Sequence, residues 1–236
     1  MKKLSLTLIS ILFLGLTAPA KNASKKAVAA PQVTTEIAPP PAGAMELTQA
    51  APPTPAVVFE GVQLAPIAKI GAADLRAVSH GIRRKKVFGL VSVDVYVAEF
   101  YAQYPDKLQK SDDQVLNSLP TAGPVQIKLT LMRDLSGSDI SKSFKEALKE
   151  NDVDLSKPVM GLSDLMTEVE SVKSFKKGEV FSLSGDWKEN HIVVQRPDQT
   201  TKTILADSDG LKKMFSIWLG KPVDDKMQDL KKNLLK

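Results

Sequence analysis

The sequence predicts an α+β fold, and three observations support this prediction. Helical patterns cluster after the β-rich segments instead of alternating with them, which disfavours a doubly wound parallel sheet. Apolar residues make up 43% of the 236-residue chain and charged residues 25%, the balance of an ordinary globular protein. From residue 56 to residue 236 the composition is that of a single core of about 180 residues, which is within the size of one domain.

The first 20 residues have the pattern of a cleaved secretory signal peptide. Lys2 and Lys3 precede an apolar run at residues 4–16, and small residues at 18–20 provide a cleavage site. The apolar run is too short to span a bilayer, and an uncleaved amphipathic anchor is the alternative. We therefore expect residues 1–20 to be removed and the mature protein to be periplasmic or secreted.

The next segment, residues 21–55, is predicted to be a disordered linker. Ala, Pro, Thr and Lys dominate it, with proline clusters at 39–41 and 52–55 and almost no residue able to fill a core. Such a composition favours an extended, solvated spacer. Peripheral contact with the cell envelope, or with a partner that binds proline-rich chains, is the alternative role.

Charge, cysteine and histidine content exclude several functions. Without the two signal-peptide lysines the net charge falls from +5 to +3, which is too small to indicate nucleic-acid binding. The absence of cysteine excludes disulfides, thiolate zinc sites and a cysteine nucleophile. The loop that starts at Asp207 lacks the acid of a calcium loop, because Trp218 occupies the twelfth position. His80, placed in a turn before Gly81, and His191 are far apart, so no metal or cofactor is predicted.

Strands are predicted where apolar residues alternate with polar ones or form short runs. The clearest is 125–132, in which Val, Ile, Leu and Leu occupy the odd positions. The longest is 87–101, which has valines at odd positions and a mixed set at even ones, as expected for a strand or hairpin arm covered mainly on one side. The remaining strands are predicted at 57–59, 180–184, 192–195 and 203–205.

Four helices are predicted from apolar residues at helical spacing. The first is capped by Ser138 or Asp139 and repeats apolar residues at offsets 0, 4, 7 and 8 from Ile140. The second spans about 162–172. The third begins after a cap at 207–209 and ends at Gly220, and the fourth follows with Pro222 just inside its start.

The run 83–86, Arg-Arg-Lys-Lys, is the notable charge cluster. If it lies in a strand, Arg83 and Lys85 point to one side and Arg84 and Lys86 to the other. Two interpretations are open. The run is a solubilising strand end, or it places a half-buried guanidinium that requires an anionic or hydrogen-bonding partner.

Four segments in order resemble the chalcone isomerase-like superfamily, in particular its secreted bacterial branch. They are Gly-Ile-Arg at 81–83, Val-Tyr-Val-Ala with Phe-Tyr at 95–101, the strand and Arg-Asp at 127–134, and Ile-Trp-Leu-Gly-Lys-Pro-Val at 217–223. The resemblance implies an open-faced β-sandwich in which a helical layer covers an antiparallel sheet. A ligand cleft is expected between the two layers.

The resemblance also implies a role for Arg83. In the plant enzymes the matching arginine stabilises the phenolate and the developing enolate during ring closure, and in the fatty-acid-binding branch it holds a carboxylate. The other polar site positions do not carry over. The enzymes' threonine, tyrosine, lysine and asparagine match Val91, Ile140, Ser143 and Ala147. We therefore expect little isomerase activity.

The leading hypothesis is a non-catalytic protein that binds a fatty acid or similar small amphipathic anion, with Arg83 pairing the head group. Val91, Leu131, Ile140 and Phe144 are the expected lining residues. Two alternatives are an intramolecular lyase of the chalcone isomerase type and an envelope interaction protein that uses its linker and basic run. For the lyase, the further candidates are Tyr96, Tyr101, Lys128 and Thr130.

Overall fold

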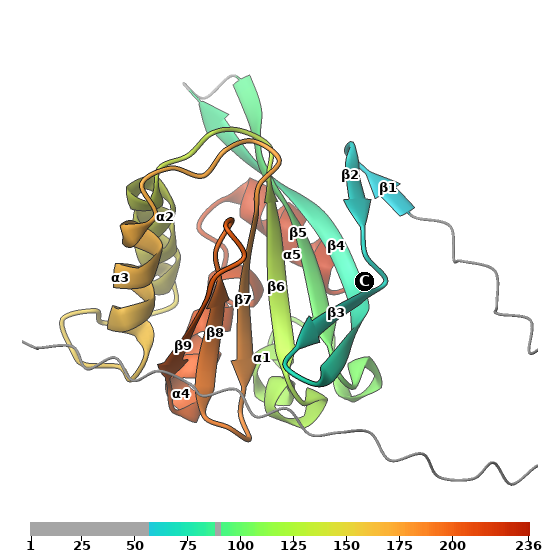
Figure 1. The fold of residues 1–236 in the computed structure, drawn as a ribbon, viewed down its shortest axis with the longest axis vertical. Coiled ribbons are helices and arrows are strands. Elements are labelled where there is room, and N and C mark those ends of the chain that lie inside the picture. The colour runs from blue at the N-terminus through green and yellow to red at the C-terminus, as the bar shows by residue number, and fades with distance from the viewer. Residues whose placement is uncertain (1–56, 88–90) are drawn as a thin grey trace, which may run out of the picture. The chain divides into compact units, whose positions relative to one another are not determined.

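The computed structural model describes residues 57–87 and 91–236, so the predicted signal peptide and linker lie outside the described residues. It confirms the α+β prediction, with a curled antiparallel sheet of seven strands in sequence order and five α-helices among these residues (Figure 1). The sheet strands are β3 (Ile67–Ile70), β4 (Ala73–Val87), β5 (Val91–Ala102), β6 (Val125–Leu131), β7 (Val180–Asp186), β8 (His191–Gln195) and β9 (Thr201–Leu205). A separate ribbon pairs β1 (Val57–Phe59) with β2 (Val62–Leu64).

The helices are α1 (Val115–Ser118), α2 (Gly137–Glu150), α3 (Leu162–Ser171), α4 (Ser208–Leu219) and α5 (Asp225–Leu234). Short 3-10 turns occupy Pro105–Lys107 and Leu119–Ala122. Helices α4 and α5 lie behind the strands in Figure 1 and join α2 in covering one face of the sheet. No helix among the described residues has the length and apolarity needed to cross a membrane.

The alternation that predicted β6 separates the two faces of the sheet. Its odd residues are buried in the main core, where Phe144 of α2 packs edge-to-face on Trp218 of α4 at 5.1 Å between ring centroids. Its even residues lie on the opposite face, where Gln126 donates a 2.9 Å hydrogen bond to Ser184. The apolar face therefore meets the helices, and the polar face carries side-chain hydrogen bonds, although the buried Thr130 hydroxyl has no partner among the described residues.

The placement of His80 and Gly81 in a turn was wrong, because both lie inside β4, where Gly81 pairs with Ala98 of β5. A glycine is required here by the close approach of α5. A Cβ atom on Gly81 would lie 2.9 Å from Leu230 Cδ1 and 3.0 Å from Asn233 Cβ. The predicted segment 87–101 is likewise divided, since Val87 ends β4 and β5 begins at Val91.

A β-bulge interrupts the β4–β5 pairing beside Arg83. Arg83 pairs with Tyr96 and Arg84 with Asp94, which leaves Val95 as an extra residue in β5. A bulge of this kind shifts the alternation of side chains by one position. In β5, the odd-numbered residues before the bulge and the even-numbered residues after it therefore point to the same face of the sheet, as Val93 and Tyr96 do.

Helix caps fix where α2 and α5 begin. The N-cap of α2 is Ser136 rather than Ser138 or Asp139, because Ser136 forms a capping box with Asp139 at the third helical position. The N-cap of α5 is Asp224, which accepts a 2.7 Å hydrogen bond from the Met227 backbone N–H. Pro222 thus precedes α5 instead of lying within it.

Candidate functional site

A cavity of about 460 Å³ lies between the sheet and the helices that cover it, within the range typical of small-molecule sites. Strands β4 to β7 form one wall, and α2, α4 and α5 form the other. Its apolar wall includes Val93, Leu129, Phe181, Ile217 and Met227. The charged lining residues are Arg83, Lys85, Arg133, Asp139, Lys142, Glu146 and Asp224.

Four of the five residues predicted to form a ligand site line this cavity together. Arg83 comes from β4, Leu131 from β6, and Ile140 and Phe144 from α2. Val91 does not line it, since it pairs with Val87 at the end of the β4–β5 hairpin and is 60% exposed. Val93 and Val95 provide the β5 part of the wall instead.

Arg83 is only 8% exposed, and its guanidinium is paired with Asp224. Nη1 and Nη2 each donate a 2.7 Å hydrogen bond to one carboxylate oxygen of Asp224, and Nη1 donates a further 2.7 Å bond to the Arg84 carbonyl. Burial lowers the pKa of Arg83, but the hydrogen bond to Asp224 and the electrostatic effects of Tyr96, Asp224 and Asp225 together outweigh it, so the pKa is raised. Burial likewise raises the pKa of Asp224, but the hydrogen bonds from Arg83 and from the Met227 and Lys226 N–H groups, together with the Arg83 charge, outweigh it, so the pKa is lowered.

The guanidinium retains unused donors. Arginine has five N–H groups in a fixed planar fork, and the described hydrogen bonds of Arg83 occupy three of them. The Nε–H and one Nη2–H make no hydrogen bond with the described residues. These two donors are parallel, the arrangement that binds a carboxylate in a bidentate manner.

Tyr96 adds a hydroxyl to the same cavity. Its oxygen accepts a 3.1 Å hydrogen bond from Trp218 Nε1. Burial raises the pKa of Tyr96 to about 12, although the Arg83 charge acts in the opposite direction. The hydroxyl is therefore protonated at neutral pH, and its hydrogen has no acceptor among the described hydrogen bonds. Tyr96 was considered in the sequence only as a catalytic candidate.

The other three residues considered for the lyase alternative lie on the opposite face of the sheet. Tyr101 donates a 2.5 Å hydrogen bond to Glu99, and Lys128 Nζ lies 2.7 Å from the other carboxylate oxygen of Glu99. Thr130 lines a separate hollow beside the β1–β2 ribbon. The structure therefore does not bring Tyr101, Lys128 and Thr130 to the cavity that contains Arg83.

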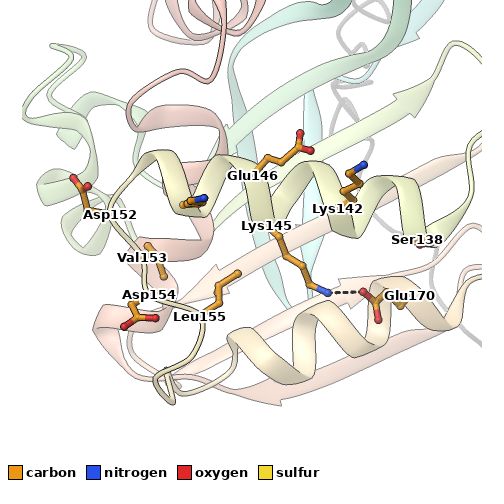
Figure 2. A pocket seen from close by; sticks show the side chains of 10 residues that line it. Ser138, Lys142, Lys145, Glu146, Asp152, Val153, Asp154, Leu155 and Glu170 are labelled. Atoms are coloured by element: carbon orange, nitrogen blue, oxygen red, sulfur yellow. Dashed lines mark hydrogen bonds and ion pairs between the residues drawn. The ribbon is translucent and has the colours of Figure 1, made fainter.

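A larger depression of about 760 Å³ lies on the outer side of α2, facing α3 and the loop after α2 (Figure 2). Charged side chains dominate it, with Lys145 and Glu170 forming a 2.6 Å ion pair across it. Both residues are nearly half exposed, which limits the energy of such a pair. Across residues 57–87 and 91–236, no group of three or more His, Asp or Glu side chains is placed to hold a metal ion. The cavity beside Arg83 is the better candidate, because it combines a buried charge with an apolar wall.

A family model described as chalcone isomerase-like matches residues 56–236. The chain belongs to the chalcone isomerase-like family. The crystal structure of a fatty-acid binding protein from Arabidopsis thaliana superposes with a TM-score of 0.55 at 16% sequence identity, covering 76% of this chain and 95% of that one. No curated protein matches the sequence.

The resemblance inferred from the sequence is thus confirmed, and so is the open-faced fold of the chalcone isomerase type. In this chalcone isomerase-like protein, the arginine of the Gly-Ile-Arg segment lines the cavity. Asp224, its carboxylate partner, was missed because it lies 141 positions away in the sequence. The sequence did contain one signal for Asp224: it stands just before the apolar stripe of the last helix, where a helix N-cap is expected.

Proposed function

We propose that this chalcone isomerase-like protein binds a fatty acid or similar amphipathic anion in the cavity beside Arg83, without catalysing a reaction on it. The observation that carries the proposal is the buried guanidinium whose Nε–H and Nη2–H donors are free, among the described residues, at the edge of an apolar cavity. A carboxylate on these donors would form charge-assisted hydrogen bonds, and the Tyr96 hydroxyl provides a further donor. The structural neighbour from Arabidopsis thaliana is a fatty-acid binding protein, which supports the same ligand class.

The energetics favour an amphipathic ligand over a small polar one. Asp224 already neutralises Arg83, so a ligand carboxylate gains less Coulomb energy there than beside an unpaired arginine. The remaining affinity must come from the alkyl chain. Burying about 300 Å² of chain against the apolar wall contributes roughly 7 kcal/mol before the entropy of association is subtracted.

A catalytic role has less support in the geometry. Of the side chains lining the cavity, Ile140 and Ala147 carry no polar group, and Ser143 is exposed on α2. Burial raises the pKa of Tyr96 to about 12, so at neutral pH its hydroxyl is protonated and can donate a hydrogen bond but cannot act as a general base. These features are suited to holding an anion.

Native mass spectrometry of the gently purified protein tests the proposal. The chain is compared with Arg83→Lys, which keeps a charge beside Asp224 but loses the planar fork, and with Arg84→Lys as the matched control. Arg84 pairs with Glu60 and Asp94 and does not line the cavity. We expect a co-purifying acid in the chain and in Arg84→Lys that is absent or depleted in Arg83→Lys. Absence of any bound acid, together with no binding of added dodecanoate, would overturn the proposal.

We also propose that the protein is secreted, with residues 1–20 removed and residues 21–55 serving as a spacer that allows peripheral envelope contact. The support is the sequence pattern of the signal segment and the low apolar content of the spacer. Expression in a bacterium, followed by fractionation and N-terminal sequencing, checks this. We expect a periplasmic product beginning at Lys21, and a cytoplasmic product with an intact N-terminus would contradict it.

A further inference from the structure

The basic run 83–86 is paired with acids at every position except one. Arg83 binds Asp224, Arg84 binds Glu60 and Asp94, and Lys86 Nζ lies 2.7 Å from Asp225. Lys85 forms no ion pair with the described residues, although its side chain lines the cavity. It lies two residues beyond Arg83 on the same strand, and therefore on the same face of the sheet.

Arg133 is a second cation of this kind. The chain has five arginines, and within the described residues the other four each form an ion pair with a carboxylate, at positions 76, 83, 84 and 196. Arg133 forms none with those residues, and it too lines the cavity. Within the described part of the chain, Arg133 is thus the one arginine without an ion pair, and Lys85 is the one member of the basic run without an ion pair. Both line the same cavity.

These two residues, which we call the rim pair, come from either side of β5: Lys85 lies in β4, and Arg133 lies in the bend that directly follows β6. Arg83 and Leu131 both pair with Tyr96, from opposite sides. Lys85 lies two residues after Arg83 and Arg133 two residues after Leu131. Strands β4 and β6 run in the same direction, so the rim pair lies at one end of the cavity. Two strand spacings, about 10 Å, separate β4 from β6. Lys85 and Arg133 line the same cavity, so their long side chains can meet one anion.

The acids that line the cavity do not neutralise the rim pair directly. Asp224 is engaged by Arg83. Asp139 and Glu146 come from α2 on the opposite wall, where Lys142 lies between them in the helix. Asp139 is also held in the α2 capping box by Ser136. The hydrogen bonds with Ser136 and, to a smaller degree, the Arg133 charge lower the pKa of Asp139, so Asp139 partly offsets Arg133 from a distance. Neither Lys85 nor Arg133, however, has a carboxylate at ion-pair distance among the described residues.

We infer that the site prefers a single-chain ligand with a phosphate monoester head group over the corresponding carboxylate, an inference that rests on the proposed binding of an amphipathic anion. A carboxylate has two oxygens and one charge, and the free donors of Arg83 satisfy both oxygens. A phosphate monoester has three terminal oxygens and close to two charges near neutral pH. Its third oxygen and second charge match the rim pair, which a fatty acid leaves without an anion.

Calorimetric titration of the full chain tests this preference with three ligands that share one alkyl chain: dodecanoate, dodecyl phosphate and dodecanol. The test variant is Lys85→Gln with Arg133→Gln. The control variant is Lys149→Gln with Lys202→Gln, which removes the same charge from exposed positions that do not line the cavity. Circular dichroism of each variant confirms that it is folded before titration.

We expect dodecyl phosphate to bind the unmodified chain about tenfold more tightly than dodecanoate, which equals the effect of about one charge-assisted hydrogen bond. The rim-pair variant should lose this preference while its dodecanoate affinity changes less than about threefold, and the control variant should keep it. Equal affinities for the two anions, or a preference that survives in the rim-pair variant, would overturn the inference while leaving the proposed function standing. Failure of both anions to bind would overturn the proposed function itself.

Discussion

Replacing Asp224 with Asn separates the two roles of this carboxylate, its pairing with Arg83 and its capping of α5. Asn is also an effective N-cap, so the hydrogen bond from the Met227 N–H is retained. The charge that opposes a ligand anion is removed. We expect the variant to be less stable than the unmodified protein but to bind dodecanoate more tightly.

Both magnitudes follow from the geometry. The two 2.7 Å bonds from Arg83 become at most one neutral bond, and losing a charge-assisted bond costs about 2 kcal/mol, or about 4–8 °C in Tm for a domain of this size. Two carboxylates on opposite edges of one guanidinium, on the order of 7 Å apart, repel by about 2 kcal/mol at an effective dielectric constant of 20. Asp224 is 35% exposed, and solvent screening reduces this to about 1 kcal/mol, or about fivefold in Kd.

Asp225→Asn is the matched control for both measurements. Asp225 is the next residue, carries the same charge and pairs with exposed Lys86, but it does not line the cavity. Thermal unfolding and calorimetry should show little change in either quantity for this variant. An unchanged or weaker dodecanoate affinity in a folded Asp224→Asn protein would refute the idea that the free edge of Arg83 receives the ligand.

Three further predictions concern stability. The pKa of Asp224 is lower in the folded protein than its unfolded-state value of about 3.9, so its ionised form stabilises the fold above that pH, and this stability is lost as the pH falls through the folded value. The Tm difference between the unmodified chain and Asp224→Asn should therefore shrink below about pH 4. A difference that grows would contradict this. Tyr96→Phe leaves the Trp218 N–H without its acceptor and should lower the unfolding free energy by about 1–3 kcal/mol, measured by urea denaturation. Gly81→Ala forces α5 away from β4 and should cost about 1–3 kcal/mol by the same assay, whereas an unchanged midpoint would show that Leu230 and Asn233 move without penalty.

The sequence was most informative where one physical pattern dominates a segment. β6 was predicted because its apolar residues strictly alternate, and α4 because Asp207 caps a clear apolar stripe. Most of β4 was missed because charged residues occupy much of it, including the run 83–86, and because Gly81 and His80 suggest a turn. Pairing with β5 and the packing of α5 overcome these local preferences.

The site was predictable only as far as local geometry determines it. Arg83 came from a motif, and Ile140 from the family resemblance, in which it matches a site tyrosine. Helical spacing placed Ile140 and Phe144 on one apolar face of α2. Val91 was misplaced because the bulge at Val95 and the end of the hairpin are not visible in an alternating run of valines. Asp224 was visible in the sequence only as a possible helix cap, and Arg133 only as part of the Arg-Asp segment. Their approach to the cavity depends on tertiary packing, which these local patterns do not specify.

The pairing of Arg83 with the cap of α5 has a consequence for biosynthesis. The two residues are 141 positions apart, and a ribosome adding about 5–20 residues per second takes on the order of ten seconds to cover that distance. Until then, α5 cannot pack on β4, and Arg83 cannot form its ion pair with Asp224. Final closure of the cavity therefore requires the last helix of the chain to have emerged, and chains truncated before α5 should be more susceptible to proteolysis than complete ones.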